Sequence, residues 1–287
     1  MKTYIINLES AHDRRESMES QAKRLGLDYE LIPAINGNAI PVNMLSLLKR
    51  DHSYAVTPGE IGCSLSHLTT YKALDASNDD CALVVEDDIF LPEDISIFLT
   101  EVENSIPKNI PYVYLLSKVN HYNSKSILDL SNGRSVHDVP GEIFHNSLII
   151  GPAAKVNHYN SKSILDLSNG RSVHDVYNAA FSHAYIINKP AARILLDKLF
   201  PIWCVADQWQ TFKEFGFIHL RGIIPEYINT NPAHESVTTI GNRNDSLIQQ
   251  EKNEAWKAIY SGRSFKIKLT KALNLLFHRP FQKIIKQ

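Results

Sequence analysis

The feature that most constrains the fold of this sequence is a short apolar run that ends in three consecutive acidic residues. Residues 82–85 are all apolar, and Glu86, Asp87 and Asp88 follow them directly. A continuous apolar run of this length is typical of a strand that is buried on both faces in a parallel sheet. Because ligands of open α/β sheets bind beyond the carboxyl ends of the strands, the three acids are expected at a binding edge.

Three neighbouring carboxylates repel one another unless a cation neutralises them. Mg²⁺ and Mn²⁺ prefer such oxygen ligands and commonly connect carboxylates to the diphosphate of a substrate. A second interpretation needs no metal, because the acids can be solvated at a strand end or can begin the helix expected nearby. The triplet alone leaves both interpretations open.

The rest of the sequence alternates between strand and helix patterns, which is typical of an α/β fold. Its length of 287 residues allows one large α/β domain or two small ones. The apolar runs and their turn residues predict strands at 4–8, 29–37, 82–85, 112–116, 184–187 and 219–224. Helices are expected after Ser10 as the capping residue, at 65–74, at 93–102, and after 187 with Pro190 in the first turn.

Two arginines follow the first expected strand. Arg14 and Arg15 fall in the first turns of the following helix, where positive charge opposes the helix dipole. Contact with a phosphate group would explain this placement. Pairing with Asp13 and Glu16 in solvent explains it equally well, so both interpretations stay open.

The segment 57–67, Thr-Pro-Gly-Glu-Ile-Gly-Cys-Ser-Leu-Ser-His, is rich in glycine and small residues. Such a composition predicts that the backbone approaches another segment closely. A glycine-containing loop that enters a helix can bind an anion at the helix N-terminus. This segment matches neither the phosphate-loop pattern nor the dinucleotide pattern, so that indication is weak on its own.

A segment of 22 residues occurs twice without a single difference. Residues 118–139 recur at 155–176, at an offset of 37 residues. Two copies are too few for a repeat architecture, so we interpret them as a recent duplication in which one copy is a tolerated loop insertion. The histidines that the copies share at 121 and 158, and at 137 and 174, are therefore not interpreted as metal ligands.

Charge and cysteine content exclude some classes of function. The formal net charge of −1 gives no reason to expect a nucleic-acid partner. The three cysteines, Cys63, Cys81 and Cys204, show no zinc-site spacing, and free thiols fit a reducing cytoplasm. Asn7 and Glu9 interrupt the apolar N-terminus too early for a signal peptide, and no apolar stretch approaches the ~20 residues of a transmembrane helix.

Taken in order, five short motifs resemble glycosyltransferase family 25, the lipopolysaccharide and lipooligosaccharide glycosyltransferases, of which many are β-galactosyltransferases. The motifs are Tyr-Ile-Ile-Asn-Leu-Glu at 4–9 with the two arginines, Ala-Ile-Asn-Gly at 34–37, Gly-Glu-Ile-Gly-Cys-Ser-Leu-Ser-His at 59–67, Val-Val-Glu-Asp-Asp at 84–88 and Ala-Tyr-Ile-Ile at 184–187. The glycine-rich segment followed by Glu-Asp-Asp is the specific part. The resemblance extends over most of residues 1 to about 240 and is interrupted between 116 and 179 by the duplication.

The resemblance implies a GT-A-like nucleotide-diphospho-sugar transferase fold, with a mostly parallel central sheet flanked by helices. It implies a UDP-sugar donor, a divalent cation, Mn²⁺ or Mg²⁺, and inversion at the anomeric carbon. The acidic motif of the family corresponds here to Glu86, Asp87 and Asp88, with Asp88 and Asp87 as metal ligands and Glu86 and Asp87 near the cofactor. Asn7, Leu8 and Arg14 correspond to the segment expected to line the nucleotide pocket.

Two further residues complete the expected site. Asp207 is the candidate catalytic base, which would accept the proton of the acceptor hydroxyl. Its apolar neighbours make its carboxylate a better proton acceptor than a solvated one. A helix cap or a structural hydrogen bond is the alternative role for Asp207. His234, in a late polar loop, is a candidate additional metal ligand, and a solvated loop histidine is the alternative.

The expected function is transfer of a hexose, galactose by resemblance, from a UDP-sugar to a lipooligosaccharide or lipopolysaccharide acceptor. The alternative is a degenerate, non-catalytic protein that binds a nucleotide sugar or carbohydrate and was inactivated by the duplication. The domain prediction is a transferase domain at 1–262, which contains the duplicated segments, and a basic amphipathic tail at 263–287.

The tail combines seven lysines and arginines with large apolar residues and contains no acid. This composition predicts a helix over about 264–277, ended by Pro280, that binds an anionic membrane surface. A helix packed on the domain with a solvated basic face is the alternative. The expected location is therefore cytoplasmic and peripheral, at the inner face of the bacterial inner membrane.

Overall fold

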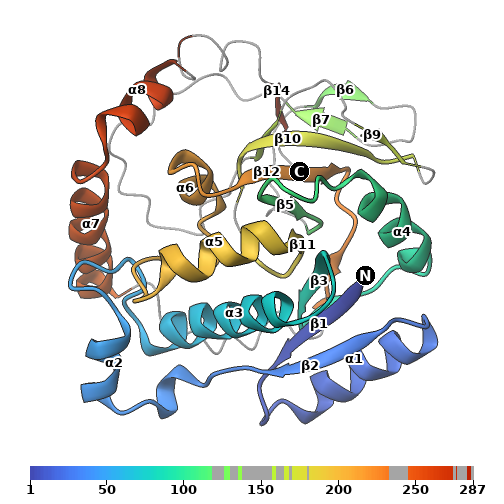
Figure 1. Ribbon diagram of the computed structural model, residues 1–287, viewed down its shortest axis with the longest axis horizontal. Helices are drawn as coiled ribbons and strands as arrows, with labels where there is room; N and C mark the ends of the chain where they lie inside the picture. The colour runs from blue at the N-terminus through green and yellow to red at the C-terminus, as the bar shows by residue number, and fades with distance from the viewer. Residues whose placement is uncertain are drawn as a thin grey trace.

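A mixed β-sheet forms the centre of the protein, and helices cover both of its faces (Figure 1). The computed structural model describes residues 1–117, 126–129, 135–137, 157–159, 165–167, 170–179, 181–232, 245–273, 276 and 283–285. The strands are β1 (Lys2–Asn7), β2 (Tyr29–Pro33), β3 (Cys81–Glu86), β4 (Ile89–Phe90), β5 (Tyr112–Leu115), β6 (Ser126–Asp129), β7 (Ser135–His137), β8 (Asn157–Tyr159), β9 (Leu165–Asp166), β10 (Ser172–Asn178), β11 (Ala184–Asn188), β12 (His219–Ile224), β13 (Asn229–Thr230) and β14 (Lys283–Ile285). The helices are α1 (His12–Arg24), α2 (Val42–Leu48), α3 (Pro58–Ala76), α4 (Ile95–Ser105), α5 (Lys189–Leu199), α6 (Trp209–Glu214), α7 (Ser246–Ser261) and α8 (Phe265–Leu273), with a 3-10 turn at Gly37–Ala39.

The main sheet has the strand order β14-β8-β10-β12-β5-β11-β3-β1-β2, and β9 pairs with β10 beside this path. In its seven-strand part from β10 to β2, the strands β1, β2, β3, β5 and β12 run in one direction. Strands β10 and β11 run against their neighbours. The predicted α/β fold with a mostly parallel central sheet is thereby confirmed, and β11 is an antiparallel strand inserted between β3 and β5.

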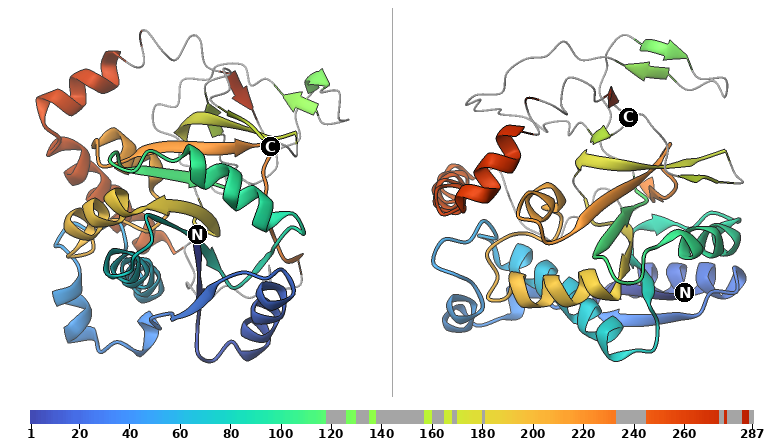
Figure 2. Two further views of the ribbon diagram at one scale, coloured as in Figure 1. Left: turned by 45° about the vertical axis from the view of Figure 1, so that its right-hand side comes forward. Right: turned by 45° about the horizontal axis from the view of Figure 1, so that its top comes forward.

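Two hydrophobic cores lie on the opposite faces of this sheet. One core joins the sheet to α3, α5 and α6, and the other joins it to α1 and α4. Figure 1 shows α3 and α5 side by side, and the turned views of Figure 2 show the helices on the two sides of the sheet. Because side chains alternate across a strand, β3 contributes Val84 to the first core and Val85 to the second. Burial on both faces explains why this strand reads as an uninterrupted apolar run.

Helix α3 begins earlier than expected, since the glycine-rich segment lies inside it. The side chain of Thr57 accepts the backbone N–H of Glu60, and the Glu60 carboxylate accepts the N–H of Thr57 in return. This capping box starts the helix at Pro58 rather than near residue 65. The same reciprocal bonds occupy the helix N-terminus that the sequence left open for an anion.

Gly62 of this segment and Gly37, which follows β2, allow two backbones to touch. A Cβ atom on Gly62 would lie 2.4 Å from the carbonyl oxygen of Ile35, and one on Gly37 would lie 1.7 Å from that of Pro58. The predicted close approach is therefore the contact of α3 with the segment after β2. Ser66 strengthens it, because its hydroxyl accepts the N–H of Ile35 at 2.8 Å.

One capping prediction is wrong and another is confirmed. Helix α1 begins at His12 behind Ala11, without a side-chain cap from any described residue, so Ser10 does not cap it. Pro190 does stand in the first turn of α5, where Asn188 caps the helix. Proline fits there because the first turn needs no N–H donor from that position.

The two duplicated segments form the same hairpin in two different settings. In the first copy β6 and β7 pair with Asp129 opposite Ser135, and in the second copy β9 and β10 pair with Asp166 opposite Ser172. These pairs occupy equivalent positions, since they differ by the 37-residue offset. Only the second hairpin, within the described residues, joins the main sheet, through the pairing of β10 with β12, whereas β6 and β7 form a two-stranded sheet of their own.

The C-terminal helices pack against the domain through ion pairs. On α7, Lys252 forms a buried ion pair with Glu60 of α3. Glu214 of α6 binds Arg263 at 3.3 Å and Lys271 of α8 at 3.0 Å. The described part of α8 is Phe265–Leu273, which lies within the predicted 264–277; residues 274, 275 and 277 lie outside the described residues. Among the described helices, none has the length and apolarity that crossing a membrane requires.

Candidate functional site

The chain brings three segments together at one edge of the main sheet. The parallel strands β1 and β3 end there, at Asn7 and Glu86. Strand β11 runs antiparallel to β3, so the residues that precede it, Ser182 and His183, lie at the same edge. The backbone N–H of Glu86 donates to the carbonyl of His183 at 2.9 Å, which fixes the two segments side by side.

Two carboxylates and an imidazole form a compact cluster at this edge. His183 Nδ1 lies 3.3 Å from Asp88 Oδ1 and 3.6 Å from Glu86 Oε2. One ligand atom from each of the three residues lies within 4.8 Å of the others, which is a spacing that can hold a metal ion. Carboxylate oxygen and imidazole nitrogen together suit Mn²⁺ and similar divalent cations, so the residues fit the cation that the sequence led us to expect.

The electrostatics of the cluster are dominated by the two carboxylates. Burial alone would lower the pKa of His183, but the negative charges of Glu86 and Asp88 outweigh it and raise that pKa to about 9. Burial alone would raise the pKa of Glu86, but the charge of His183 and the contacts with His67 and Ser182 bring that pKa to about 2. Glu86 is therefore ionised, and its negative charge attracts cations to the cluster.

Asp87 points to a different set of partners. Its Oδ2 accepts a hydrogen bond from Asn7 Nδ2 at 2.6 Å, and its Oδ1 pairs with Arg14 at 3.1 Å. Burial raises the pKa of Asp87, and the hydrogen bond from Asn7 and the charge of Arg14 offset this effect only in part. The structure thus brings Asn7, Arg14 and Asp87 together beside the cluster of Glu86, Asp88 and His183.

Leu8 lies in the turn that follows this part of the edge. Its carbonyl accepts the N–H of Ala11 at 2.8 Å, which closes the turn between β1 and α1. Its place next to Asn7 keeps it at the edge where the sequence predicts the nucleotide pocket.

Asp207 approaches the cluster from the loop before α6. Its Oδ2 accepts the backbone N–H of Phe181 at 3.4 Å, and Trp209 Nε1 donates to the carbonyl of the same residue at 2.9 Å. The charge of Asp207 also contributes to the raised pKa of His183. The N-cap of α6 is Gln208, so Asp207 is not its capping residue and remains a half-buried carboxylate beside the site.

The predicted ligand His234 lies outside the described residues. Asn231 does lie at the site, because its N–H donates to the backbone carbonyl of Asp88 at 2.6 Å. Strand β13 also pairs with β4, which directly follows the acidic residues.

Sequence reasoning assigned no role to His183, Ser182 or His67. The hydroxyl of Ser182 donates to Glu86 Oε1 at 2.6 Å, and His67 Nε2 lies 3.5 Å from the same oxygen. A Ser-His pair in front of a buried strand is visible in the sequence. It becomes informative only when that strand is known to run antiparallel to β3, because otherwise these residues would lie at the opposite edge.

Comparison with known proteins agrees with this geometry. A family model described as "Glycosyltransferase family 25 (LPS biosynthesis protein)" matches residues 1–209. The chain belongs to glycosyltransferase family 25. The match includes β1, β3, β11 and Asp207, and therefore the carboxylates and the histidine of the site. The family that the sequence resemblance indicated is thereby confirmed.

Curated relatives of this family 25 chain include enzymes named for galactose transfer. The chain is 37% identical over 99 residues to a "Glycosyltransferase 25 family member" of Aedes aegypti, covering 30% of this chain and 16% of that protein. It is 33% identical over 97 residues to "Procollagen galactosyltransferase 1-A" of Xenopus laevis, covering 31% and 16%. It is 32% identical over 95 residues to "Procollagen galactosyltransferase 2" of Homo sapiens, covering 30% and 15%. These matches span only about a sixth of the relatives' own length.

Proposed function

We propose that this family 25 glycosyltransferase transfers galactose from a UDP-sugar to a lipooligosaccharide or lipopolysaccharide acceptor, with inversion and with Mn²⁺ or Mg²⁺ bound. The observation that carries the proposal is the convergence of Glu86, Asp88 and His183 where β1 and β3 end. The names of the relatives support galactose, and the description of the family model supports a lipopolysaccharide acceptor. A divalent cation held by these three residues would supply positive charge against the negative charge that develops on the leaving diphosphate.

The chain's own residues perform the remaining tasks. Arg14 and Asn7 lie at the same edge and hold Asp87 in place, and the positive charge of Arg14 beside the cation site favours the diphosphate of the nucleotide. Asp207 accepts the proton of the acceptor hydroxyl as that oxygen attacks the anomeric carbon. The N–H of Phe181 orients the Asp207 carboxylate, whose charge also acts on the nearby His183.

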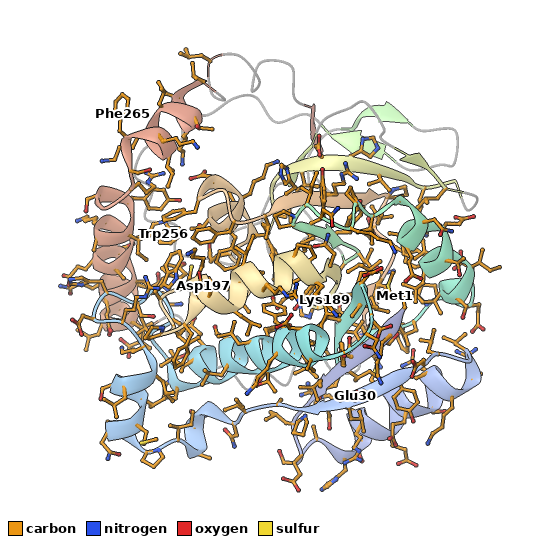
Figure 3. The ribbon with its side chains drawn as sticks, in the orientation of Figure 1. Met1, Glu30, Lys189, Asp197, Trp256 and Phe265 are labelled. Carbon is orange, nitrogen blue, oxygen red and sulfur yellow. The ribbon has the colours of Figure 1, made fainter. Side chains whose placement is uncertain are left out.

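The decisive experiment is the substitution Asp88→Asn in the full chain. The carboxamide keeps the shape of the side chain but loses the charge, so metal-dependent turnover of the UDP-sugar should fall to background while thermal unfolding stays cooperative. Asp197→Asn is the matched control, since Asp197 is an exposed carboxylate on α5 (Figure 3) that pairs with the neighbouring Lys198. Near-normal activity of Asp88→Asn at saturating Mn²⁺ would refute the assignment.

A panel of UDP-sugars separates galactose from other hexoses and tests the non-catalytic alternative. A live enzyme turns over its donor only with Mn²⁺ or Mg²⁺ present, and proton NMR of the product reports whether the anomeric configuration is inverted. A chain that binds the nucleotide sugar but turns over none of them would instead be a degenerate transferase.

We also propose that the protein works as a peripheral protein at the cytoplasmic face of the bacterial inner membrane, held there by its C-terminal tail. Helix α8 exposes an apolar stripe at helical spacing, with Phe265 78%, Leu269 46% and Leu273 44% exposed. Phe265 points away from the domain in Figure 3. Basic residues flank the stripe and no acid occurs in 263–287, a combination that favours an anionic lipid surface.

Vesicle co-sedimentation tests this attachment. The full chain should bind anionic vesicles at low salt and dissociate from them at high salt. A chain that ends at Gly262 should bind weakly at either salt concentration. Equal binding of the two chains would show that residues 263–287 do not attach the protein to the membrane.

A further inference from the structure

A second group of metal-ligating side chains lies directly behind the proposed cation site. Cys63 and His67 are one helical turn apart on α3 and therefore share a face of that helix. This face meets the end of β3, where one ligand atom each of Cys63, His67 and Glu86 lies within 4.8 Å of the other two. Thiolate and imidazole ligands favour Zn²⁺ over the hard cations Mg²⁺ and Mn²⁺.

The two oxygens of Glu86 face two different groups. Oε2 lies 3.6 Å from His183, on the side of Asp88. Oε1 lies 3.5 Å from His67 Nε2 and accepts the hydroxyl of Ser182 at 2.6 Å. The carboxylate therefore stands between the two groups and offers one oxygen to each.

The buried imidazole of His67 is oriented as a metal ligand is. Its Nδ1 lies 2.7 Å from the hydroxyl of Tyr185, which donates in turn to Tyr71 at 3.1 Å. Because the Tyr185 hydroxyl donates onwards, it accepts the proton of Nδ1, and Nε2 presents its lone pair. Hydrogen bonding of the outer ring nitrogen is the usual way in which proteins hold a ligating histidine.

The remaining nitrogen, His67 Nε2, is buried and forms no hydrogen bond with any described residue, although its side chain is only 2% exposed. A lone pair that faces a carboxylate in a buried site is unfavourable unless a proton or a metal ion lies between them. The Nε2–Oε1 distance of 3.5 Å is too long for good hydrogen bonding. It is close to the roughly 3.3–3.5 Å expected between two ligands of a tetrahedral Zn²⁺ with bonds of about 2.0–2.1 Å.

We propose that Cys63, His67 and Glu86 bind Zn²⁺, with Cys63 as the thiolate, His67 through Nε2 and Glu86 through Oε1. Binding releases the thiol proton to solvent, and a water molecule completes four ligands. Zn²⁺ at this position binds the Glu86 carboxylate, which is also a ligand of the first site. Zn²⁺ therefore inhibits the Mn²⁺-dependent transferase, a consequence that rests on the proposed function.

Cobalt substitution tests the site without any assay of activity. Co²⁺ added to the metal-free full chain should give a thiolate-to-cobalt charge-transfer absorption that saturates at one equivalent, and Zn²⁺ should abolish it. The absorption should be lost in Cys63→Ser and weakened in His67→Gln. It should persist in Cys81→Ser, which removes a buried thiol from the start of β3, and in Asp88→Asn, which alters only the first site.

A second measurement requires no variant. Zn²⁺ should protect Cys63 of the wild-type chain from alkylation by iodoacetamide, as followed by peptide mass spectrometry, whereas Mg²⁺ should not. Absence of the cobalt–thiolate absorption, its equal loss in Cys81→Ser, or alkylation unaffected by Zn²⁺ would overturn the proposal and leave His67 as a positioning residue for Glu86. In the transferase assay, Cys63→Ser should require about tenfold more Zn²⁺ for half-inhibition. Because the cobalt result does not depend on turnover, a failure of the proposed function is distinguishable from a failure of the zinc site.

Discussion

The ion pair between Lys252 and Glu60 allows a sharp test of how the C-terminal helices support the transferase fold. The Glu60 carboxylate is 1% exposed and the Lys252 side chain 7% exposed. Glu60 Oε2 also accepts the N–H groups of Val56 and Thr57, so the same side chain caps α3 and anchors α7. Lys252→Met keeps the aliphatic bulk of the side chain but removes the ammonium group, which also lies over the Tyr54 ring, and leaves the buried carboxylate without its counter-charge.

Removing one partner of a buried ion pair costs about 3–5 kcal/mol, because the remaining charge is uncompensated. For a chain of this size, 1 kcal/mol shifts the melting temperature by roughly 2–4 °C, so Lys252→Met should melt about 6–20 °C lower. Adding Glu60→Gln removes the stranded charge and keeps a carbonyl oxygen for the capping box. The loss of stability in the double variant should therefore be at least about 1 kcal/mol smaller than the sum of the losses in the two single variants.

The free energy of unfolding is measured by urea titration at pH 7, followed by circular dichroism, for the four members of this cycle. Lys257→Met is the matched control, since Lys257 is exposed on the same helix and its replacement should change stability by no more than about 0.5 kcal/mol. A loss below about 1 kcal/mol for Lys252→Met, or strictly additive losses, would show that α7 is not held by this ion pair.

Three further outcomes follow from the structure. Gly62→Ala should lower stability by about 1–3 kcal/mol or more in urea titration, because its Cβ would lie 2.4 Å from the Ile35 carbonyl, whereas Gly262→Ala, with 3.4 Å to its nearest atom, should be close to neutral. Burial lowers the pKa of Lys213 from 10.5 to about 8, so between pH 8 and 10.5 the lysine is protonated in the unfolded chain but not in the folded one. The free energy of unfolding should therefore rise with pH over this range, and this rise should be missing in Lys213→Met. Deletion of residues 118–154 removes β6 and β7 but none of the described strands of the main sheet, so thermal unfolding should stay cooperative; loss of that transition would show that both copies are structural.

The centre of the sheet could be predicted from the sequence because β3 and β11 are buried on both faces. Strand β12 was predicted with the bounds that the structure gives it, and β3 and β11 within one residue at each end. The start of α3 was missed, since a segment with two glycines and a proline does not look helical. The reason those glycines are tolerated is a contact with Ile35 and Gly37, which only the tertiary structure brings near.

The site was predictable in its acids and not in its histidines. Glu86, Asp87 and Asp88 stand in one run, and their place at the end of a buried strand follows from local pattern alone. The different partners of these acids do not follow from local pattern, because they depend on the side that each carboxylate faces. Asp87 contacts Asn7 and Arg14, whereas Asp88 contacts His183. Those orientations are set by segments 73 or more residues away in the sequence.

The duplication also shows that local sequence determines local structure but not its place in the fold. Both copies form a hairpin with equivalent register, so the local sequence determines the hairpin. Within the described residues, only the second copy joins the main sheet, because only its strand β10 leads directly into Phe181, Ser182, His183 and β11. An insertion ahead of that junction leaves the pairing of β11 with β3 intact, and with it the position of His183 against Glu86 and Asp88. The duplicated segment can therefore lengthen the chain by 37 residues without displacing the site, which is why catalysis is expected to survive it.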